Sequence, residues 1–180
     1  MTAWPQIVWS EAQQIVDRIG WQVAVPAALP PDIFFARLWD EGQLVKALLY
    51  LAHALSRRDA IEWALACLYD NGIDREDPVA RAATEWLEDA SDANRRAADY
   101  AGGKALPGSA EQLLASAIFL SGGSIAAEEQ TPVLLRPETC ARFVACSIIK
   151  AATRGTAFEQ KMGRALSMGE AVARGTQKGF

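Results

Sequence analysis

The chain contains a single histidine, His53, so a Ser-His-Asp or Cys-His catalytic arrangement would have to use it. No G-x-S-x-G sequence presents a nucleophilic serine, and no H-E-x-x-H or other spaced ligand set accompanies the histidine. Cys67 follows on a neighbouring predicted helix, which leaves a Cys-His pair open. A structural histidine that bonds a nearby backbone group or Asp59 is the simpler interpretation, so a small enzyme using His53 is our third hypothesis.

The stretch AIFLSGGSIA, residues 117–126, combines two glycines with two serines, as some phosphate-binding loops do. A phosphate loop follows a strand and opens a helix with Lys-Ser/Thr. Here an apolar helical run precedes the glycines and an acidic segment follows them. Glycine directly after a helix is typical of a left-handed C-cap. We therefore predict that Gly122 or Gly123 has a positive φ and ends a helix, and we expect no cofactor.

Acidic residues gather in two places. Residues 70–77 resemble a calcium loop only superficially, because the closing glutamate is missing, so turns and helix caps explain them. The second group is four carboxylates that we place along one helical face: Glu85, Glu88, Asp89 and Asp92. Two-metal sites of this kind also need Glu-x-x-His motifs, which the sequence lacks, so we predict no metal. A solvated face and an acidic patch for a basic partner both stay open.

Three of the six tryptophans lie in the first 24 residues: Trp4, Trp9 and Trp21. They either dock this segment on the rest of the protein or, if exposed, mark a surface that binds a partner. We accordingly divide the chain into an N-terminal helix with an aromatic arm (1–24), a helical domain (25–175) and a flexible tail (176–180).

The composition describes one globular domain, with 180 residues, 51% hydrophobic and 22% charged. The formal net charge of −4, with only the short pairs Arg57-Arg58 and Arg95-Arg96, argues against nucleic acid as a partner. The three cysteines occupy apolar helical patterns, so we interpret them as buried hydrophobes in a reducing compartment: Cys67, Cys140 and Cys146. Without a signal peptide or an apolar run near the ~18 residues of a membrane span, we expect a cytoplasmic protein and no membrane partner.

The elements that must position these residues are all helical. Apolar residues recur at spacings of three and four, and no convincing strand alternation occurs. N-cap residues precede the helical runs at Ser10, Ser56, Asp77, Ser91, Ser109 and Thr156. Seven or eight helices joined by short turns predict an all-α, single-domain bundle or a short solenoid-like stack, although no repeated signature is present.

Two segments resemble an uncharacterised bacterial all-helical family, a domain of unknown function. The first is AIFLSGGSIA with the following TPVLLRPE and CARFVACSIIKAA, and the second is YLAHALSRRDAIEWALAC at residues 50–67. The resemblance covers about residues 25–155 and implies no enzyme activity. Some members are encoded near type VI secretion genes, which implies an accessory, adaptor or effector-handling role. That family has a proline-rich connector after the glycine pair, whereas this chain has AAEEQ at 126–130.

Our leading hypothesis is therefore a non-enzymatic protein-protein interaction module associated with type VI secretion. Its partner would be another protein, a secretion component, an effector or a toxin, bound by an exposed groove or by the aromatic arm. The alternative is an immunity protein that neutralises a toxin through the acidic face.

Overall fold

The computed structural model describes residues 4–127 and 129–176. Within these ranges it contains nine α-helices and no strand. They are α1 (Ala12–Ile19), α2 (Pro31–Asp40), α3 (Leu44–Ala54), α4 (Arg57–Asp70), α5 (Pro78–Glu88), α6 (Asp92–Gly102), α7 (Ala110–Phe119), α8 (Glu138–Ala152) and α9 (Phe158–Ala173). The predicted all-α class is confirmed, with one helix more than expected. None of the helices so described is long and apolar enough to cross a membrane.

Side-chain caps start four of the helices at the predicted residues. The hydroxyl oxygens of three serines accept a hydrogen bond from the backbone N–H three residues later: Ser56, Ser91 and Ser109. At α5 the carboxylate of Asp77 accepts from two backbone N–H groups, and Pro78 follows at the first helical position. These bonds satisfy N–H groups that have no partner within the helix, which is why the starts were readable from the sequence.

Two other starts differ from the prediction by one residue. The N-cap of α1 is Glu11 instead of Ser10, and its backbone N–H donates to Oε1 of Gln14 at 3.0 Å. This reciprocal capping box displaces the serine as cap. The N-cap of α9 is Ala157, with φ 65°, in place of Thr156.

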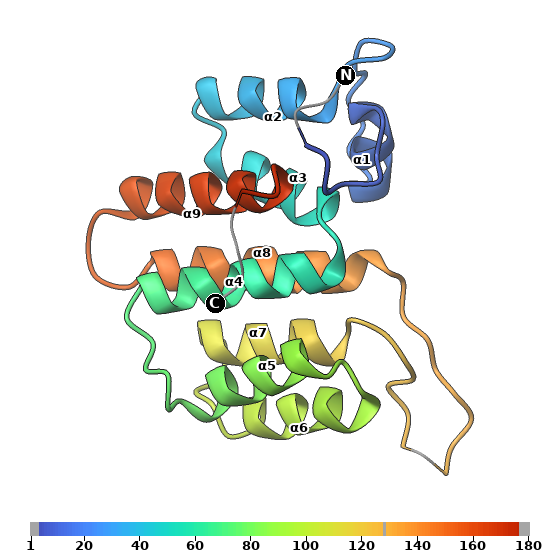
Figure 1. The fold of residues 1–180 in the computed structure, drawn as a ribbon, viewed down its shortest axis with the longest axis vertical. Helices are drawn as coiled ribbons and strands as arrows, with labels where there is room; N and C mark the ends of the chain where they lie inside the picture. Colours follow the sequence, from blue (N-terminus) through green and yellow to red (C-terminus); the bar gives the residue numbers. More distant parts are fainter. Residues whose placement is uncertain (1–3, 128, 177–180) are drawn as a thin grey trace.

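The helices stack along the long axis of the molecule, with α1 and α2 at one end, α4 and α8 in the middle and α6 at the other end (Figure 1). Helix α8 packs against α3, α4, α7 and α9, and α9 returns to pack against α3 and α4. In a linear repeat array each unit contacts only its neighbours. The returning helices close this fold into a bundle.

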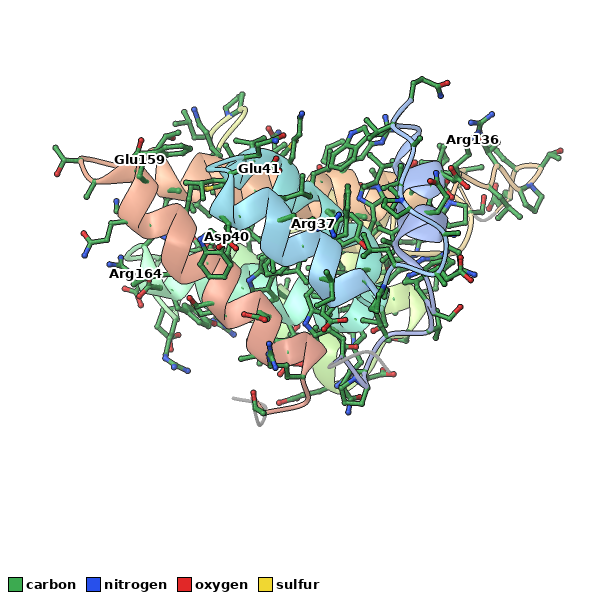
Figure 2. The ribbon with its side chains drawn as sticks, turned by 90° about the horizontal axis from the view of Figure 1, so that it is seen from above. Arg37, Asp40, Glu41, Arg136, Glu159 and Arg164 are labelled. Carbon is green, nitrogen blue, oxygen red and sulfur yellow. The ribbon has the colours of Figure 1, made fainter. Side chains whose placement is uncertain are left out.

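Two hydrogen bonds between buried groups join the central helices. The indole Nε1 of Trp63 in α4 donates to the carbonyl of Ala165 in α9 at 2.8 Å. Oγ of Ser147 in α8 donates to the carbonyl of Ala110 in α7 at 2.8 Å. On the outside, charged side chains such as those of Arg37, Glu159 and Arg164 lie on α2 and α9, the helices seen from above in Figure 2. Each of these bonds pairs a buried polar side chain with a carbonyl of another helix.

The N-terminal segment belongs to the same core as the rest of the chain. The Trp4 side chain is fully buried, and its ring lies 5.1 Å from that of Phe35 in α2. From α1, Ile15 and Val16 are fully buried in the same cluster. The arm predicted at residues 1–24 is thus docked from residue 4 onward, while residues 177–180 of the predicted tail lie outside the described part of the chain.

The three cysteines are free thiols, but they do not share one environment. Cys67 and Cys140 are buried, as predicted. The prediction is wrong for Cys146, which is exposed because it lies on the outer face of α8.

Candidate interaction site

The loop between α7 and α8, residues 121–137, contains the glycine pair. Helix α7 ends at Phe119, and Gly123 has a φ of 64°, the positive value predicted for one of the two glycines. Gly122 is not in the positive-φ region. The prediction that one of these glycines ends the helix is wrong, because the C-cap of α7 is Leu120, with a φ of −90°, and the glycine pair lies in the turn that follows.

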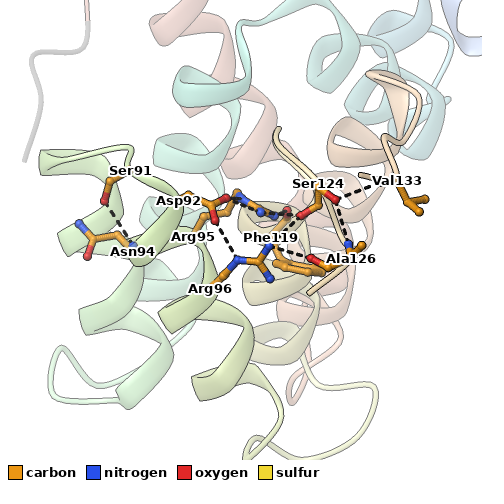
Figure 3. A network of polar contacts seen from close by, with 9 residues as sticks. All are labelled: Ser91, Asp92, Asn94, Arg95, Arg96, Phe119, Ser124, Ala126 and Val133. Atoms are coloured by element: carbon orange, nitrogen blue, oxygen red, sulfur yellow. Dashed lines mark hydrogen bonds and ion pairs between the residues drawn. The ribbon is translucent and has the colours of Figure 1, made fainter. Parts of the chain in front are cut away.

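Two arginines of α6 hold the start of this loop by its carbonyl groups (Figure 3). Arg95 donates from Nη1 to the carbonyl of Phe119 at 2.5 Å and from Nη2 to that of Ser124 at 2.8 Å. Arg96 donates from Nη2 to the carbonyl of Ala126 at 2.9 Å. A planar guanidinium can serve several carbonyls at once, which suits it to fixing an irregular backbone. We call residues 121–137 the clamped loop.

Asp92 orients both arginines. Its Oδ1 accepts from Nε of Arg95 and its Oδ2 from Nε of Arg96, each at 2.8 Å. The hydrogen bonds from Arg96 and Arg95 lower the pKa of the Asp92 carboxyl. Arg95 is only 3% exposed, and its guanidinium also lies 4.7 Å from the ring centroid of Phe119. The buried cation is thus paired, as a buried charge must be.

Within the clamped loop, hydrogen bonds join the segment that follows α7 to the segment that leads into α8. Oγ of Ser124 accepts from the backbone N–H groups of Ala126 and Val133, and the N–H of Ile125 donates to the carbonyl of Val133 at 3.0 Å. On the α4 side, Nη1 of Arg57 donates to the carbonyl of Ser121 at 2.6 Å. The loop is therefore fixed from α4, from α6 and from within itself.

Three consecutive apolar side chains of the clamped loop face outward. Val133 is 48% exposed, Leu134 73% and Leu135 40%. The two leucines also line a cavity of about 190 Å³ with Arg57 and Pro137. A run of exposed apolar residues on an ordered backbone is unfavourable in water and is typical of a surface that binds another molecule.

The predicted acidic face is wrong in its geometry. Helix α5 ends at Glu88, Asp89 is its C-cap, and Asp92 begins α6, so the four carboxylates span a turn between two helices. Glu85, Glu88 and Asp89 are exposed. The carboxylate of Asp92 forms ion pairs with Arg95 and Arg96. Across the described ranges, no group of three or more His, Cys, Asp or Glu side chains is placed to hold a metal ion.

The three N-terminal tryptophans have different environments. Trp4 is in the core, so its side chain is not available to a partner, contrary to the binding role we considered. Trp9 is half-buried, with the guanidinium carbon of Arg18 5.3 Å from its ring centroid. Trp21 is half-buried and lines a cavity of about 550 Å³ between residues 20–26 and α2, which we call the Trp21 cavity.

His53 is buried, and its Nδ1 lies 2.8 Å from the carbonyl oxygen of Leu49. Because a carbonyl only accepts, Nδ1 carries the proton and Nε2 is the bare nitrogen. Desolvation, opposed by that hydrogen bond, lowers the pKa of His53. It shares a cavity of about 30 Å³, room for about one water, with Cys140, and burial raises the pKa of that thiol to about 12. A thiol with a raised pKa is a poor nucleophile.

Arg57, Arg95 and Arg96 were not among the predicted site residues. From the sequence we interpreted Arg57-Arg58 and Arg95-Arg96 only as short basic pairs. One signal was present, because Arg95 shares the helical spacing of Ala98 and Gly102, the other buried residues of α6. An arginine on a buried face needs partners, and here they come from a loop nearly thirty positions away.

Fold and site together define an all-α domain that presents an apolar loop on an arginine clamp. Residues 34–173 match the model of the "Family of unknown function (DUF6931)", and the chain belongs to this family. The match begins within α2 and ends with α9, so it includes the whole clamped loop. The resemblance to an uncharacterised family is confirmed at that level. The chain matches no curated protein and no solved structure.

Proposed function

We propose that this protein is a non-enzymatic protein-protein interaction module that binds its partner through the apolar run of the clamped loop. The observation that carries the proposal is the exposure of Val133, Leu134 and Leu135 next to an ordered backbone. Val133 is hydrogen-bonded to Ser124 and Ile125, in the part of the loop whose carbonyls accept from arginine side chains. No packing need of this domain explains three adjacent exposed hydrophobes, whereas burial against a partner would remove them from water.

The hydrogen bonds that order the clamped loop should also increase its affinity for a partner. Ordering a loop on binding costs free energy, and a loop already ordered by hydrogen bonds avoids most of that cost. Burial of an apolar side chain contributes about 1.5–3 kcal/mol when it goes from exposed to fully covered. Two leucines and a valine on a fixed backbone are therefore sufficient for the centre of a modest interface.

The family resemblance supports an accessory, adaptor or effector-handling role associated with bacterial type VI secretion. The segment that departs from that family, AAEEQ at 126–130, lies within the clamped loop. A partner surface is where such a difference would change which protein is bound. The environment of His53, with room for about one water and a high-pKa thiol, supports a role without catalysis.

An immunity protein that neutralises a toxin is the second candidate. Its support is the exposed carboxylates of Glu85, Glu88 and Asp89, which would attract a basic partner by long-range charge. Asp92 contributes less to such a face, because Arg95 and Arg96 are paired with it.

The test is capture of the partner from native bacterial cells by the affinity-tagged protein, with mass spectrometry of what is bound. We expect the variant Leu134→Asp/Leu135→Asp to lose at least about tenfold of the captured partner, because these side chains form the interface centre. Leu106→Asp is the matched control, since Leu106 is an exposed leucine in another loop, and it should retain binding.

The variant Glu85→Lys/Glu88→Lys separates the two candidates. If it abolishes capture and the leucine variant does not, the immunity role replaces our proposal. If all three variants capture the partner equally, the clamped loop is not the binding surface. Circular dichroism and thermal melting of each variant distinguish lost binding from lost folding.

A further inference from the structure

The Trp21 cavity lies at the end of the bundle opposite α6, where the chain leaves α1. Gly20 ends α1 with a φ of 85°, and residues 20–26 then run beside α2. Its volume of about 550 Å³ is within the range of pockets that hold small organic ligands. Nothing in the proposed function uses this cavity.

Its wall is tied to α1 by hydrogen bonds. The N–H of Trp21 donates to the carbonyl of Val16 at 3.2 Å, and the N–H of Val25 donates to Oε1 of Gln13 at 2.9 Å. Both ends of the extended segment are therefore held to the same helix. A cavity with such a wall is formed before a ligand arrives, which lowers the cost of binding.

Aromatic and aliphatic side chains provide the apolar part of the lining. Trp21 and Phe34 are both half-buried, and Leu38 is almost fully buried between α2 and the core. The ring of Phe34 is supported from behind by that of Tyr50 at a centroid distance of 5.2 Å. These surfaces suit the apolar body of a ligand, since half-buried rings can bury further area against it.

The charged residues of the lining favour an anion. Arg37 and Lys46 are exposed, and neither forms an ion pair with any residue that the structure describes. The one carboxylate in the lining, Glu41, accepts a hydrogen bond from Nε2 of Gln43 at 2.5 Å. Arg37 and Glu41 both lie at the outer surface of α2 (Figure 2). The charged residues of the lining thus carry a net charge of one positive unit, beside the apolar side chains of Trp21, Phe34 and Leu38.

We propose that the Trp21 cavity binds a small amphipathic carboxylate, a molecule with an alkyl or aromatic body and one acidic group. The body contacts Trp21, Phe34 and Leu38, and the carboxylate pairs with Arg37 or Lys46. A neutral molecule of the same shape would leave the two cations unpaired, and an amphipathic cation would be repelled by them. The acid is therefore the class that satisfies both parts of the lining.

Calorimetric titration of the full chain with octanoate, octan-1-ol and acetate tests the proposal. We expect octanoate to bind at one site, octan-1-ol to bind about fivefold to tenfold more weakly, and acetate not to bind measurably. The indole N–H resonance of Trp21, assigned by Trp21→Phe, should shift with octanoate. Absence of octanoate binding, or equal affinity for the acid and the alcohol, would overturn the proposal.

Variants locate the site and check the charge. Arg37→Gln/Lys46→Gln should weaken octanoate binding about fivefold to tenfold and leave octan-1-ol unchanged, since only the anionic group loses its partners. Arg58→Gln/Lys150→Gln removes two exposed cations elsewhere and should change neither. Ala24→Phe, which places a ring in the cavity wall, should abolish both. If octanoate binds all of these variants alike, it binds at another place and the assignment is wrong.

Discussion

The buried side chain of His53 makes the stability of the fold depend on pH. Its Nδ1 proton is held by the carbonyl of Leu49, and its Nε2 has no hydrogen-bond partner in the described protein. Besides desolvation, the positive charges of Arg142 and Arg18 disfavour protonation, and Glu138 partly offsets them. The neutral imidazole is thus the form that fits the folded state.

Because the folded-state pKa of His53 is lowered, its contribution to stability is fully present above the unfolded pKa of about 6.5 and is lost as the pH falls below that value. We expect the free energy of unfolding of the wild type, relative to His53→Met, to fall by up to about 1.4 kcal/mol per pH unit below that point. Urea unfolding of both proteins between pH 5 and pH 8 measures this. Parallel pH profiles would contradict it, because the variant lacks the titrating group.

The clamped loop is the element on which the proposed function depends. The buried Arg95 holds the start of the loop, because it donates to the carbonyl of Phe119 and is the nearer of two donors to that of Ser124. Arg96 is more exposed, and it donates to the carbonyl of Ala126 at 2.9 Å and to that of Ser124 at 3.3 Å. Substitution of Arg95 should therefore lower the free energy of unfolding more than substitution of Arg96.

We expect Arg95→Met to lower the free energy of unfolding by about 1–3 kcal/mol, since it leaves the part-buried carbonyl of Phe119 without its side-chain donor. Amide hydrogen exchange in the clamped loop should accelerate in the same variant. Arg96→Met is the control and should cost less than about 1 kcal/mol, because its ion pair is partly solvated. Equal losses in the two variants would mean that burial of Arg95 is not what holds the loop.

At the scale of the whole molecule, the return of α9 onto α3 and α4 closes the bundle. Gly169 lies where α9 meets Trp63, and a Cβ atom there would be 2.6 Å from the ring and 2.7 Å from the Leu51 side chain. Glycine is required here by the close approach of the helices, since its φ is not positive. Its absence of a side chain lets the Trp63 indole reach α9.

We expect Gly169→Ala to lower the free energy of unfolding by about 1–3 kcal/mol, because the rigid indole ring cannot move aside without strain. Gly163→Ala in the same helix meets nothing within 4 Å and should raise stability by about 0.5–1 kcal/mol through its helix propensity. Chemical denaturation of the two variants gives the comparison. A stabilised Gly169→Ala variant would show that α9 is not tightly packed at this point.

Much of the helical framework could be predicted, because its signals are local. A serine or aspartate at an N-cap and an apolar stripe act within one or two turns, so the starts at Ser56, Asp77, Ser91 and Ser109 were correct. The site was less predictable, because its contacts are long-range. Arg95 and the carbonyl of Ser124 are paired only after α6 and α7 pack together.

Composition and periodicity by themselves determined an all-α domain, the places where most helices begin, and a turn at the glycine pair. The tertiary structure decided which of those residues are available. Trp4 is enclosed by the packing of α2, Asp92 is paired within the clamp, and Leu134 is left exposed on it. Exposure depends on what the rest of the chain covers, and helical spacing does not contain that information.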